Sequence, residues 1–413
     1  MPDLSPLDCL NDLVARIGPF DRLGVAVSGG SDSLAALILA IDALGAGSVA
    51  AVTVDHGLRP EAAEEAQRVA DLCKTLGVEH QILHWGGPSG GNLQDEARQA
   101  RLALIGGWAR GRVDAVLVAH TQDDQAETLL MRLARGSGVD GLSGMTEMRR
   151  SDGVMWLRPF LNVPRTSLRR VLSERGVSWV EDPSNADDRF QRVRARTALA
   201  ALAPLGIDAP GLAATAARLQ RARAALDAQT AEAMRDVLSE DAGTAVLSKS
   251  VLGLAPEIRD RVFAHLLIAM SGASYRPRLD GLHRLIGDMG TLMGCVLVDE
   301  GAHLRLYREA RAVEELVASS DELWDGRWRA EGPGRGVIRA MGDDGLRQLS
   351  TQAKAGLHPH WRGTGLSAGI LSACPAIWRN GQIIAAPLAF WPQKWHLFAR
   401  PLAAIGDRLE LSH

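Results

Sequence analysis

The sequence predicts an α/β protein: a parallel sheet covered by helices, followed by a helical domain and a small α+β domain. The first half alternates strand-like apolar runs with amphipathic helical patterns, and this rhythm is typical of a parallel sheet with helices on both faces. After Pro204 the composition shifts toward alanine and arginine, with apolar residues at helical spacing. The length of 413 residues allows two or three hydrophobic cores.

The elements of the first half follow from apolar runs and helical periodicity. The expected strands are Leu23–Val27, Val49–Val54, His80–His84 and Ala115–Ala119. The expected helices between them are Asp32–Leu44, Pro60–Leu76, Leu93–Arg110 and Asp123–Arg135. A fifth strand over Met155–Leu161 precedes Pro164, which is tolerated in the first turn of a helix that we expect to run to about Arg175.

The second half divides into a helical part and a glycine-rich part. Helical periodicity covers Gly211–Asp241, Pro256–Ala269 and Arg278–Asp288. Beyond Asp321 the chain becomes glycine-rich, with short β-like runs at Gly336–Ala340 and Gln382–Ala386. We therefore predict domain boundaries at 1–207, 208–322 and 323–413.

Composition excludes several classes of protein. Hydrophobic residues make up 46% of the chain and charged residues 23%, which is typical of a globular protein and not of a disordered or fibrous one. No apolar run reaches the roughly 18 residues of a membrane span, so we expect a cytoplasmic protein without a membrane partner. The four cysteines lie far apart with no CxxC pair, which argues against a disulfide framework or a cysteine metal site.

The charge balance predicts a local basic patch rather than a basic protein. The formal net charge is −3, yet the segment from Arg149 to Arg196 holds eleven arginines and six acidic residues. Four of these arginines lie within eight residues, at Arg189, Arg192, Arg194 and Arg196. They could contact RNA phosphates, or they could form an ordinary solvated helix face in an arginine-rich chain.

A glycine- and serine-rich loop predicts a phosphate site. It consists of Ser28, Gly29, Gly30, Ser31, Asp32 and Ser33, between the first strand and the next helix. Glycines allow close approach of an anion, and the unpaired amides at a helix N-terminus favour phosphate groups. Asp32 could hold a metal ion that offsets phosphate charge. A capped helix start without any ligand is the alternative. The loop does not match the Walker phosphate-binding pattern GxxxxGK[ST] or the dinucleotide-binding pattern GxGxxG.

Two carboxylates share one face of the expected helix Asp123–Arg135. Asp124 and Glu127 lie about 60° apart around a helix axis, and Leu129, Leu130 and Leu133 mark the opposite face. We therefore expect both carboxylates to point away from the core. They could bind a metal ion or a substrate ammonium group, or they could form a solvated first turn that favours the helix dipole.

The order of the motifs identifies a family. SGGxDS after a first strand resembles the PP-loop of the N-type ATP pyrophosphatases. The motifs that follow narrow the resemblance to the tRNA(Ile)-lysidine synthases: Asp55-His56-Gly57-Leu58-Arg59, Asn92 with Glu96-Ala97-Arg98 and Arg101, His120 before Asp123–Thr128, Arg135–Gly138, Arg158-Pro159 and Glu181–Asn185. The resemblance covers about the first 200 residues with specific motifs and is weaker beyond them. Val193 and Leu102 depart from the family pattern, which has an asparagine and an aromatic residue there.

The resemblance implies a PP-loop domain of the adenine-nucleotide α-hydrolase type, with ATP and Mg²⁺ bound. It implies that the helical and C-terminal domains bind tRNA. The implied catalytic residues are Asp32, Asp124, Glu127, Arg98 and Arg194, with Mg²⁺ held by Asp32 and Asp124. The implied nucleotide site is the loop Ser28–Ser33 together with Asp55, His56 and His120. Both histidines follow expected strands, at the edge where parallel sheets bind ligands. Arg189, Arg192, Arg194 and Arg196 are the expected RNA contacts.

The reaction implied by the resemblance is ligation of L-lysine to carbon 2 of the wobble cytidine of isoleucine tRNA with a CAU anticodon. ATP would adenylate that position and release pyrophosphate. A tRNA thiolase on the same fold, an amidating synthetase and a tRNA-binding protein with a degenerate nucleotide site are the alternatives. The absence of CxxC pairs disfavours the first, and intact acidic residues disfavour the last. The sequence leaves the oligomeric state open, with a homodimer as one option.

Overall fold

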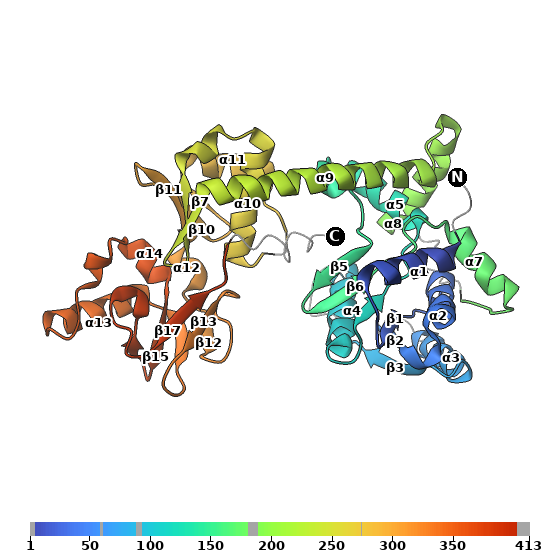
Figure 1. Cartoon of the computed structure of the whole chain (residues 1–413), viewed down its shortest axis with the longest axis horizontal. Coiled ribbons are helices and arrows are strands. Elements are labelled where there is room, and N and C mark those ends of the chain that lie inside the picture. The colour runs from blue at the N-terminus through green and yellow to red at the C-terminus, as the bar shows by residue number, and fades with distance from the viewer. Residues whose placement is uncertain (1–4, 58–60, 88–92, 181–188, 274, 403–413) are drawn as a thin grey trace. The chain divides into compact units, whose positions relative to one another are not determined.

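The computed structural model describes residues 5–57, 61–87, 93–180, 189–273 and 275–402, and these fall into two compact units (Figure 1). The N-terminal unit covers residues 1–224 and the C-terminal unit residues 225–412. Three stretches named in the sequence analysis lie outside the described residues: Leu58-Arg59, Asn92 and Glu181–Asn185.

The N-terminal unit is built on a six-stranded sheet with the order β3-β2-β1-β4-β6-β5. The strands are β1 Leu23–Ala26, β2 Val49–Asp55, β3 Glu79–His84, β4 Ala115–Leu117, β5 Met148–Ser151 and β6 Val154–Leu157. All pairings are parallel except that of β5 with β6. The predicted parallel sheet is confirmed. The edge strand β5 was not predicted, because it is short and forms a hairpin with β6.

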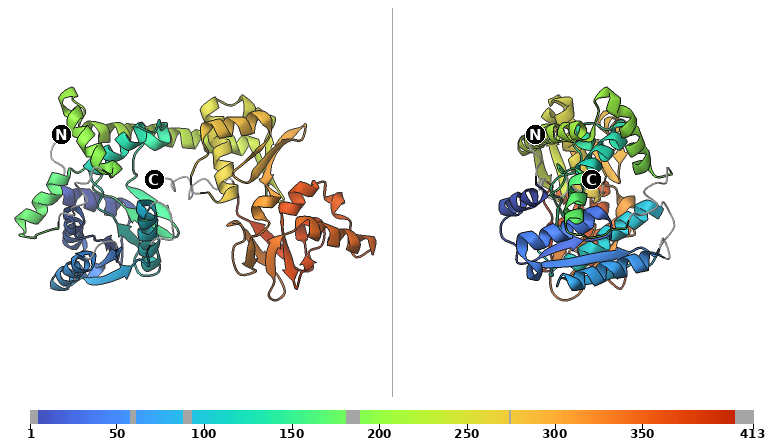
Figure 2. Two further views of the ribbon diagram at one scale, coloured as in Figure 1. Left: turned by 180° about the vertical axis from the view of Figure 1, so that it is seen from behind. Right: turned by 90° about the vertical axis from the view of Figure 1, so that its right-hand side faces the viewer.

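Helices cover both faces of this sheet, as Figure 2 shows from two further sides. The helices of this unit are α1 Pro6–Ile17, α2 Ser31–Leu44, α3 Glu61–Thr75, α4 Leu93–Ala109, α5 Gln122–Leu133, α6 Val139–Leu142, α7 Arg165–Glu174 and α8 Gln191–Leu202. One core cluster joins residues of α1, α2, α3 and α7 to Leu23 and Val25 of β1. A second cluster joins Trp108 of α4 to Ala26. Successive β1 residues thus pack into opposite cores, as a doubly covered strand requires.

Gly24 in β1 shows why one position of the sheet lacks a side chain. A Cβ atom there would lie 2.9 Å from Cζ3 of Trp108, a buried ring on α4. The glycine lets this helix pack closely on the strand that carries the loop Ser28–Ser33.

The C-terminal unit holds far more β-structure than the sequence predicts. Helix α9, Ala209–Val237, passes from one unit into the other. It leads to an antiparallel sheet in the order β7-β8-β11-β10-β9, formed by Leu238–Asp241, Thr244–Ser248, His303–Arg308, Cys295–Asp299 and Thr291–Leu292. Helices α10, Pro256–Ser271, and α11, Leu279–Asp288, pack with this sheet in one core cluster.

The three helices expected in the helical domain 208–322 are present, but this part of the chain also contains the five-stranded sheet, which the sequence did not predict. The helical pattern was extended through Leu238–Asp241, which is strand β7. The chain reverses at Ala242 and Gly243, with φ of 48° and 75°. Two residues with positive φ form a tight hairpin turn. The usual sequence signal for such a turn is Asn-Gly or Asp-Gly, and an alanine at the first position does not provide it.

The last part of the chain forms a smaller α+β region whose strand pairs are all antiparallel. Its four-stranded sheet has the order β12-β14-β15-β16, formed by Val317–Ser319, Val337–Ala340, Pro375–Arg379 and Gln382–Ala385. Strands β13, Trp328–Glu331, and β17, His396–Ala399, form a separate pair. The helices here are α12 Ala310–Val313, α13 Gly342–Lys354 and α14 Ala368–Ala373. The predicted α+β character is confirmed.

No single helix among the described residues is long and apolar enough to cross a membrane. The segments Gln191–Leu205 and Ala209–Val237 meet that test only as a pair, with a bend of 100° between them.

Candidate active site

Three carboxylates from two helices meet beside the carboxyl ends of strands β1 and β4. Asp32 lies in the first turn of α2, which follows β1, and Asp124 and Glu127 lie on α5, which follows β4. Because β1 and β4 are neighbouring parallel strands, the two helix starts lie at the same edge of the sheet. Asp32, Asp124 and Glu127 are called the acidic cluster below.

Arg165 ties the acidic cluster together. Its Nε atom lies 2.9 Å from Oδ2 of Asp32, its Nη2 atom 3.2 Å from Oδ1 of Asp124, and its Nη1 atom 3.8 Å from Oε1 of Glu127. Burial lowers the pKa of Arg165, but the three carboxylates outweigh burial and raise that pKa above its usual range. The guanidinium therefore stays charged and serves as the common counter-ion of the three acids.

Asp123 fixes the position of Arg165. Its Oδ2 atom accepts a hydrogen bond of 2.8 Å from the backbone N–H of Arg165, at the start of α7. The backbone N–H of Gln122 donates to the carbonyl of Val163, at 2.9 Å. The start of α5 thus holds the start of α7, and each acid of the cluster meets a different nitrogen of one guanidinium.

The expectation that Asp124 and Glu127 point away from the core is wrong. Their exposed fractions are 6% and 1%, whereas Leu133, expected to be buried, is 56% exposed. Asp124 is turned inward by a capping box, in which its Oδ2 atom accepts from both the backbone N–H and the hydroxyl of Thr121, each at 2.8 Å. Nearby arginines compensate the cost of burying the two charges.

Two of the expected RNA contacts also reach the acidic cluster. The Nε atom of Arg196 lies 2.5 Å from Oε1 of Glu127, and the Nη1 atom of Arg192 lies 3.9 Å from Oδ1 of Asp124. Both come from α8, which packs on α5. Arg189 and Arg194 are exposed, and Nη1 of Arg194 donates to the backbone carbonyl of Arg189 at 3.2 Å. Arg98 is exposed as well.

The acids of the cluster differ in how burial affects them. Burial raises the pKa of Asp32 and the pKa of Glu127. For Asp124 burial, which raises the pKa, is outweighed by the neighbouring His120, Arg165 and Arg192 and by the backbone hydrogen bond from Thr121, so the pKa of Asp124 falls. Asp124 is therefore the most firmly ionised of the three, and Glu127 is better suited to exchange a proton.

The loop Ser28–Ser33 has the shape of a phosphate cradle. Gly29 has a φ of 85°, which favours glycine, and Gly30 caps α2 without a side-chain hydrogen bond to the helix amides. The Ser33 hydroxyl accepts from the backbone N–H of Ser28 at 3.1 Å and donates to the carbonyl of Gly30 at 2.9 Å. Ser33 thus braces the loop, while the amides at the start of α2 stay available to an anion.

Two histidines line the same edge of the sheet. His56 follows β2 and His120 follows β4, and the Nδ1 atom of each is buried without a hydrogen-bond partner. Burial lowers the pKa of both, that of His120 far below its usual value. Each is therefore a neutral ring with an unused nitrogen. Asp55 differs, because its Oδ1 atom accepts from the backbone N–H of Gly57 at 2.9 Å and so shapes the turn.

The donor set of the cluster fits a hard cation. Carboxylate oxygens are the ligands that Mg²⁺ prefers, and the Oε2 atom of Glu127 is buried with no hydrogen-bond partner. Within the described residues, no three His, Cys, Asp or Glu side chains converge closely enough to hold a metal by themselves. Arg165 lies among the three carboxylates, so a cation bound there would share or replace its contacts.

The comparisons with known proteins agree with this geometry. Residues 9–203 match the PP-loop domain family. The sheet order, the cradle after β1 and the adjacent acids thus define an enzyme domain of the ATP-utilising PP-loop class.

Relatives over the whole chain define the family. The tRNA(Ile)-lysidine synthase of Ruegeria pomeroyi is 44% identical over 402 residues, which cover 94% of each chain. That of Rhizobium meliloti is 36% identical over 372 residues, covering 81% of this chain and 79% of the relative. The chain belongs to the tRNA(Ile)-lysidine synthase family and is a ligase.

One solved structure resembles about half of the chain. A U34-tRNA thiolase from Methanococcus maripaludis aligns with a TM-score of 0.44 and 17% identity, covering 52% of this chain and 77% of that one. All four cysteines of this chain are free.

Proposed function

We propose that this protein joins the ε-amino group of L-lysine to carbon 2 of the wobble cytidine in isoleucine tRNA with a CAU anticodon, using ATP and Mg²⁺. The observation that carries the proposal is the acidic cluster beside the loop Ser28–Ser33, at one edge of the sheet. Anion-binding amides and cation-binding carboxylates there lie within reach of a single substrate complex.

The loop and its neighbours bind ATP. The uncapped amides at the start of α2 donate hydrogen bonds to phosphate oxygens, and the hydroxyls of Ser28 and Ser31 add donors. The neutral rings of His56 and His120 line the site and can hydrogen-bond to nucleotide or base. Asp32 and Asp124 are the residues that would hold Mg²⁺, which offsets phosphate charge when bound.

ATP makes the cytosine oxygen a leaving group. The oxygen on carbon 2 attacks the α-phosphorus, and the bond to pyrophosphate breaks. The lysine nitrogen then attacks carbon 2 and AMP leaves with that oxygen. Arg98 and Arg101 provide positive charge for the phosphates, and burial together with Arg98 and Arg192 lowers the pKa of Arg101.

Glu127 prepares the lysine nucleophile. An ammonium group has no lone pair and must lose a proton before it attacks. The unpaired Oε2 atom of Glu127 can accept that proton, and its raised pKa suits the task. Asp124, held ionised, attracts the ammonium group to the same place.

The exposed arginines of α8 and the segment before it serve the RNA. Arg189 and Arg194 are exposed and can contact phosphates next to the anticodon. Arg192 and Arg196 balance the charge of the acidic cluster, and the RNA contact expected of them from the sequence stays a prediction.

Transfer of labelled lysine to a CAU-anticodon tRNA transcript tests the proposal. We expect incorporation with ATP and Mg²⁺, none without ATP, and none with Asp32→Ala. Asp42→Ala is the matched control on the same helix, because Asp42 pairs with Arg175 away from the cluster, and it should retain activity. Pyrophosphate release without lysine transfer would overturn the assigned nucleophile and point to a different one.

A further inference from the structure

Arg165 was not selected from the sequence, yet it lies at the centre of the acidic cluster. Its guanidinium lies within 4.0 Å of all three acids, and its two closest contacts are with Oδ2 of Asp32 and Oδ1 of Asp124. These two acids are the ones that would hold Mg²⁺ in the proposed function. The guanidinium therefore takes up oxygens that a divalent cation needs.

Asp124 has a single oxygen to offer to a cation. Its Oδ2 atom accepts hydrogen bonds from the backbone N–H and the hydroxyl of Thr121, each at 2.8 Å, and this capping box fixes the start of α5. Its Oδ1 atom accepts a hydrogen bond of 3.2 Å from Arg165. A cation that leaves the capping box intact can therefore reach Asp124 only at the oxygen that Arg165 contacts.

The other two acids show the same competition. Asp32 accepts from the Ser31 hydroxyl through Oδ1, at 3.2 Å, and from Arg165 through Oδ2, at 2.9 Å. On Glu127 the Oε1 atom lies 2.5 Å from Nε of Arg196, whereas the Oε2 atom is buried with no hydrogen-bond partner. Within the described residues no three acids converge closely enough to hold a metal by themselves. Arg165 thus lies between acids that a cation would draw together.

The charges of the cluster are already balanced. The three carboxylates face three guanidinium groups, those of Arg165, Arg192 and Arg196, so the formal charges cancel. A divalent cation added to this set would meet as much positive as negative charge. Loss of the Arg165 charge alone would leave a net negative site, which attracts a cation.

The Arg165 side chain can leave the acids without unfolding its helix. Asp123 holds the backbone N–H of Arg165 at the start of α7, but the side chain beyond it is long and 18% exposed. Its partner Asp32 lies in the first turn of α2, whose amides are available to phosphate. A guanidinium that leaves the acids therefore has an anionic partner beside it when phosphate is bound.

We propose that Arg165 is an exchangeable counter-ion, whose guanidinium opposes the binding of a divalent cation to Asp32 and Asp124 and gives up both acids when that cation binds. Arg165 is thus a positioning residue. The inference rests on the proposed function insofar as Asp32 and Asp124 are taken as the metal ligands. The expected effect has an opposite sign to that of an ordinary site residue, because removing Arg165 strengthens the binding of a cation.

The test measures the binding of Mn²⁺ to the full chain, without ATP, tRNA or lysine, by electron paramagnetic resonance. Arg165→Gln removes the charge but keeps a hydrogen-bond donor, and it should bind Mn²⁺ about tenfold more tightly than the wild type. Arg165→Lys keeps the charge and should bind Mn²⁺ as weakly as the wild type. The matched control is Arg175→Gln at the other end of α7, where Arg175 pairs with Asp42, and it should not change the affinity.

A double variant locates the cation that binds. Arg165→Gln/Asp124→Asn also lacks the Asp124 carboxylate, so the gain in Mn²⁺ affinity should disappear. No substrate is present in these titrations. Failure of lysine transfer therefore counts against the proposed function alone, and an unchanged Mn²⁺ affinity of Arg165→Gln counts against the exchange alone.

Two results of the titrations would overturn the proposal. A Mn²⁺ affinity of Arg165→Gln equal to or below that of the wild type would make Arg165 a fixed scaffold, since acids that disperse bind a cation more weakly. A gain that survives in the double variant would place the cation elsewhere. If Arg165→Gln is too unstable to titrate, Mn²⁺ should raise its melting temperature more than that of the wild type, and an equal rise would contradict the exchange.

Discussion

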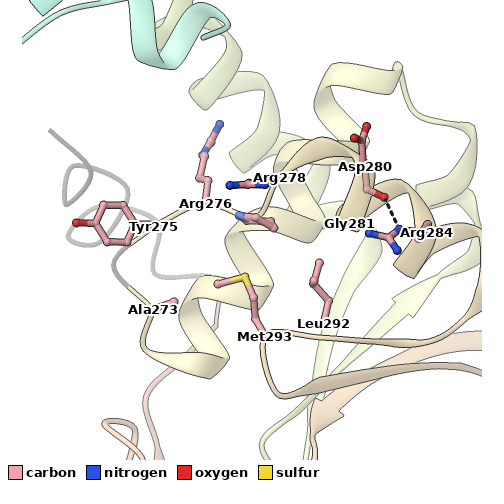
Figure 3. Close-up of a pocket in the computed structure, with 10 residues that line it drawn as sticks. Ala273, Tyr275, Arg276, Arg278, Asp280, Gly281, Arg284, Leu292 and Met293 are labelled. Carbon is pink, nitrogen blue, oxygen red and sulfur yellow. Dashed lines mark hydrogen bonds between the residues drawn. The ribbon is translucent and has the colours of Figure 1, made fainter. Parts of the chain in front are cut away.

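Arg165 in the acidic cluster and Arg284 in the C-terminal unit carry the same charge in opposite surroundings. Arg165 is 18% exposed and meets three carboxylates. Arg284 is exposed at the cavity of Figure 3, and its Nε atom donates to the backbone carbonyl of Asp280 at 3.3 Å. A buried guanidinium must be matched by acids, because a buried charge without a partner is costly, whereas a solvated guanidinium needs no partner. Burial and pairing, rather than residue type, decide what each arginine contributes.

The largest expected effect is that of Arg165→Ala. Removing the guanidinium leaves three carboxylates close together without their common partner, and breaking such a partly buried network costs about 3 kcal/mol of unfolding free energy. Lysine transfer should fall at least about a hundredfold, because the acids lose their fixed positions. Chemical denaturation and the transfer assay measure the two effects.

Arg175→Ala is the control for Arg165→Ala. Arg175 pairs with Asp42, but its side chain is 47% exposed, so the loss should be about 1 kcal/mol or less. Arg165→Lys should recover only part of the activity, since a point charge cannot meet three carboxylates at once. Equal losses of stability for Arg165→Ala and Arg175→Ala would show that the cluster is no tighter than a surface pair.

The second prediction separates the two acids of α5. Asp124→Asn and Glu127→Gln should each reduce lysine transfer by about a hundredfold or more. Asp124→Asn should also lower the free energy of unfolding by about 1–2 kcal/mol, because Asp124 forms the capping box with Thr121. Glu127→Gln should cost less stability near neutral pH, because burial opposes the ionised form of Glu127. The same stability loss in both variants would contradict this difference.

The third prediction concerns pH. The pKa of Glu127 is raised in the folded state above its usual value of 4.5, so the folded chain binds this proton more tightly than the unfolded chain. The contribution of Glu127 to stability is therefore present below that value and is lost as pH rises through the folded pKa. Asp124, with a lowered pKa, contributes stability above its usual value of 3.8, and this is lost as pH falls.

Melting temperatures measured across the acidic pH range test the opposite pH dependences expected for Glu127 and Asp124. As pH rises above about 4.5, the stability of Glu127→Gln relative to the wild type should increase. For Asp124→Asn the relative stability should decrease as pH rises through the titration of Asp124. If the melting temperatures of the wild type and of Glu127→Gln changed in parallel with pH, burial would not raise the pKa of Glu127.

Much of the N-terminal unit could be predicted from local sequence. The strand Leu23–Val27 and the loop after it were correctly placed, because glycine, serine and the start of an apolar helix are local signals. Asp124 and Glu127 were assigned to the right helix but to the wrong side of it. Periodicity counts apolar residues and cannot detect that Arg165 and Arg196 compensate buried charge from elsewhere in the chain.

Arg165 was missed although a signal for it exists. It begins the helix after β6, and β6 lies beside β4 in the sheet. The rule that ligands lie at the carboxyl ends of parallel strands selected His56 and His120, and the same rule applies here. In a chain rich in arginine, however, residue type alone does not separate this position from surface arginines. The five-stranded sheet β7-β8-β11-β10-β9 was missed because its strands are short and lie between helices.

The smallest expected effect is that of Arg284→Ala. The side chain is exposed and its contact with the carbonyl of Asp280 lies within one helix, so its loss should change the free energy of unfolding by about 0.5 kcal/mol or less. Mn²⁺ binding should match that of the wild type, because Arg284 belongs to the C-terminal unit and the acidic cluster to the N-terminal unit. Chemical denaturation and the Mn²⁺ titration measure the two quantities. A loss of stability as large as that of Arg165→Ala would show that a solvated arginine can contribute as much as one that meets three carboxylates, and the contrast between the two surroundings would fail.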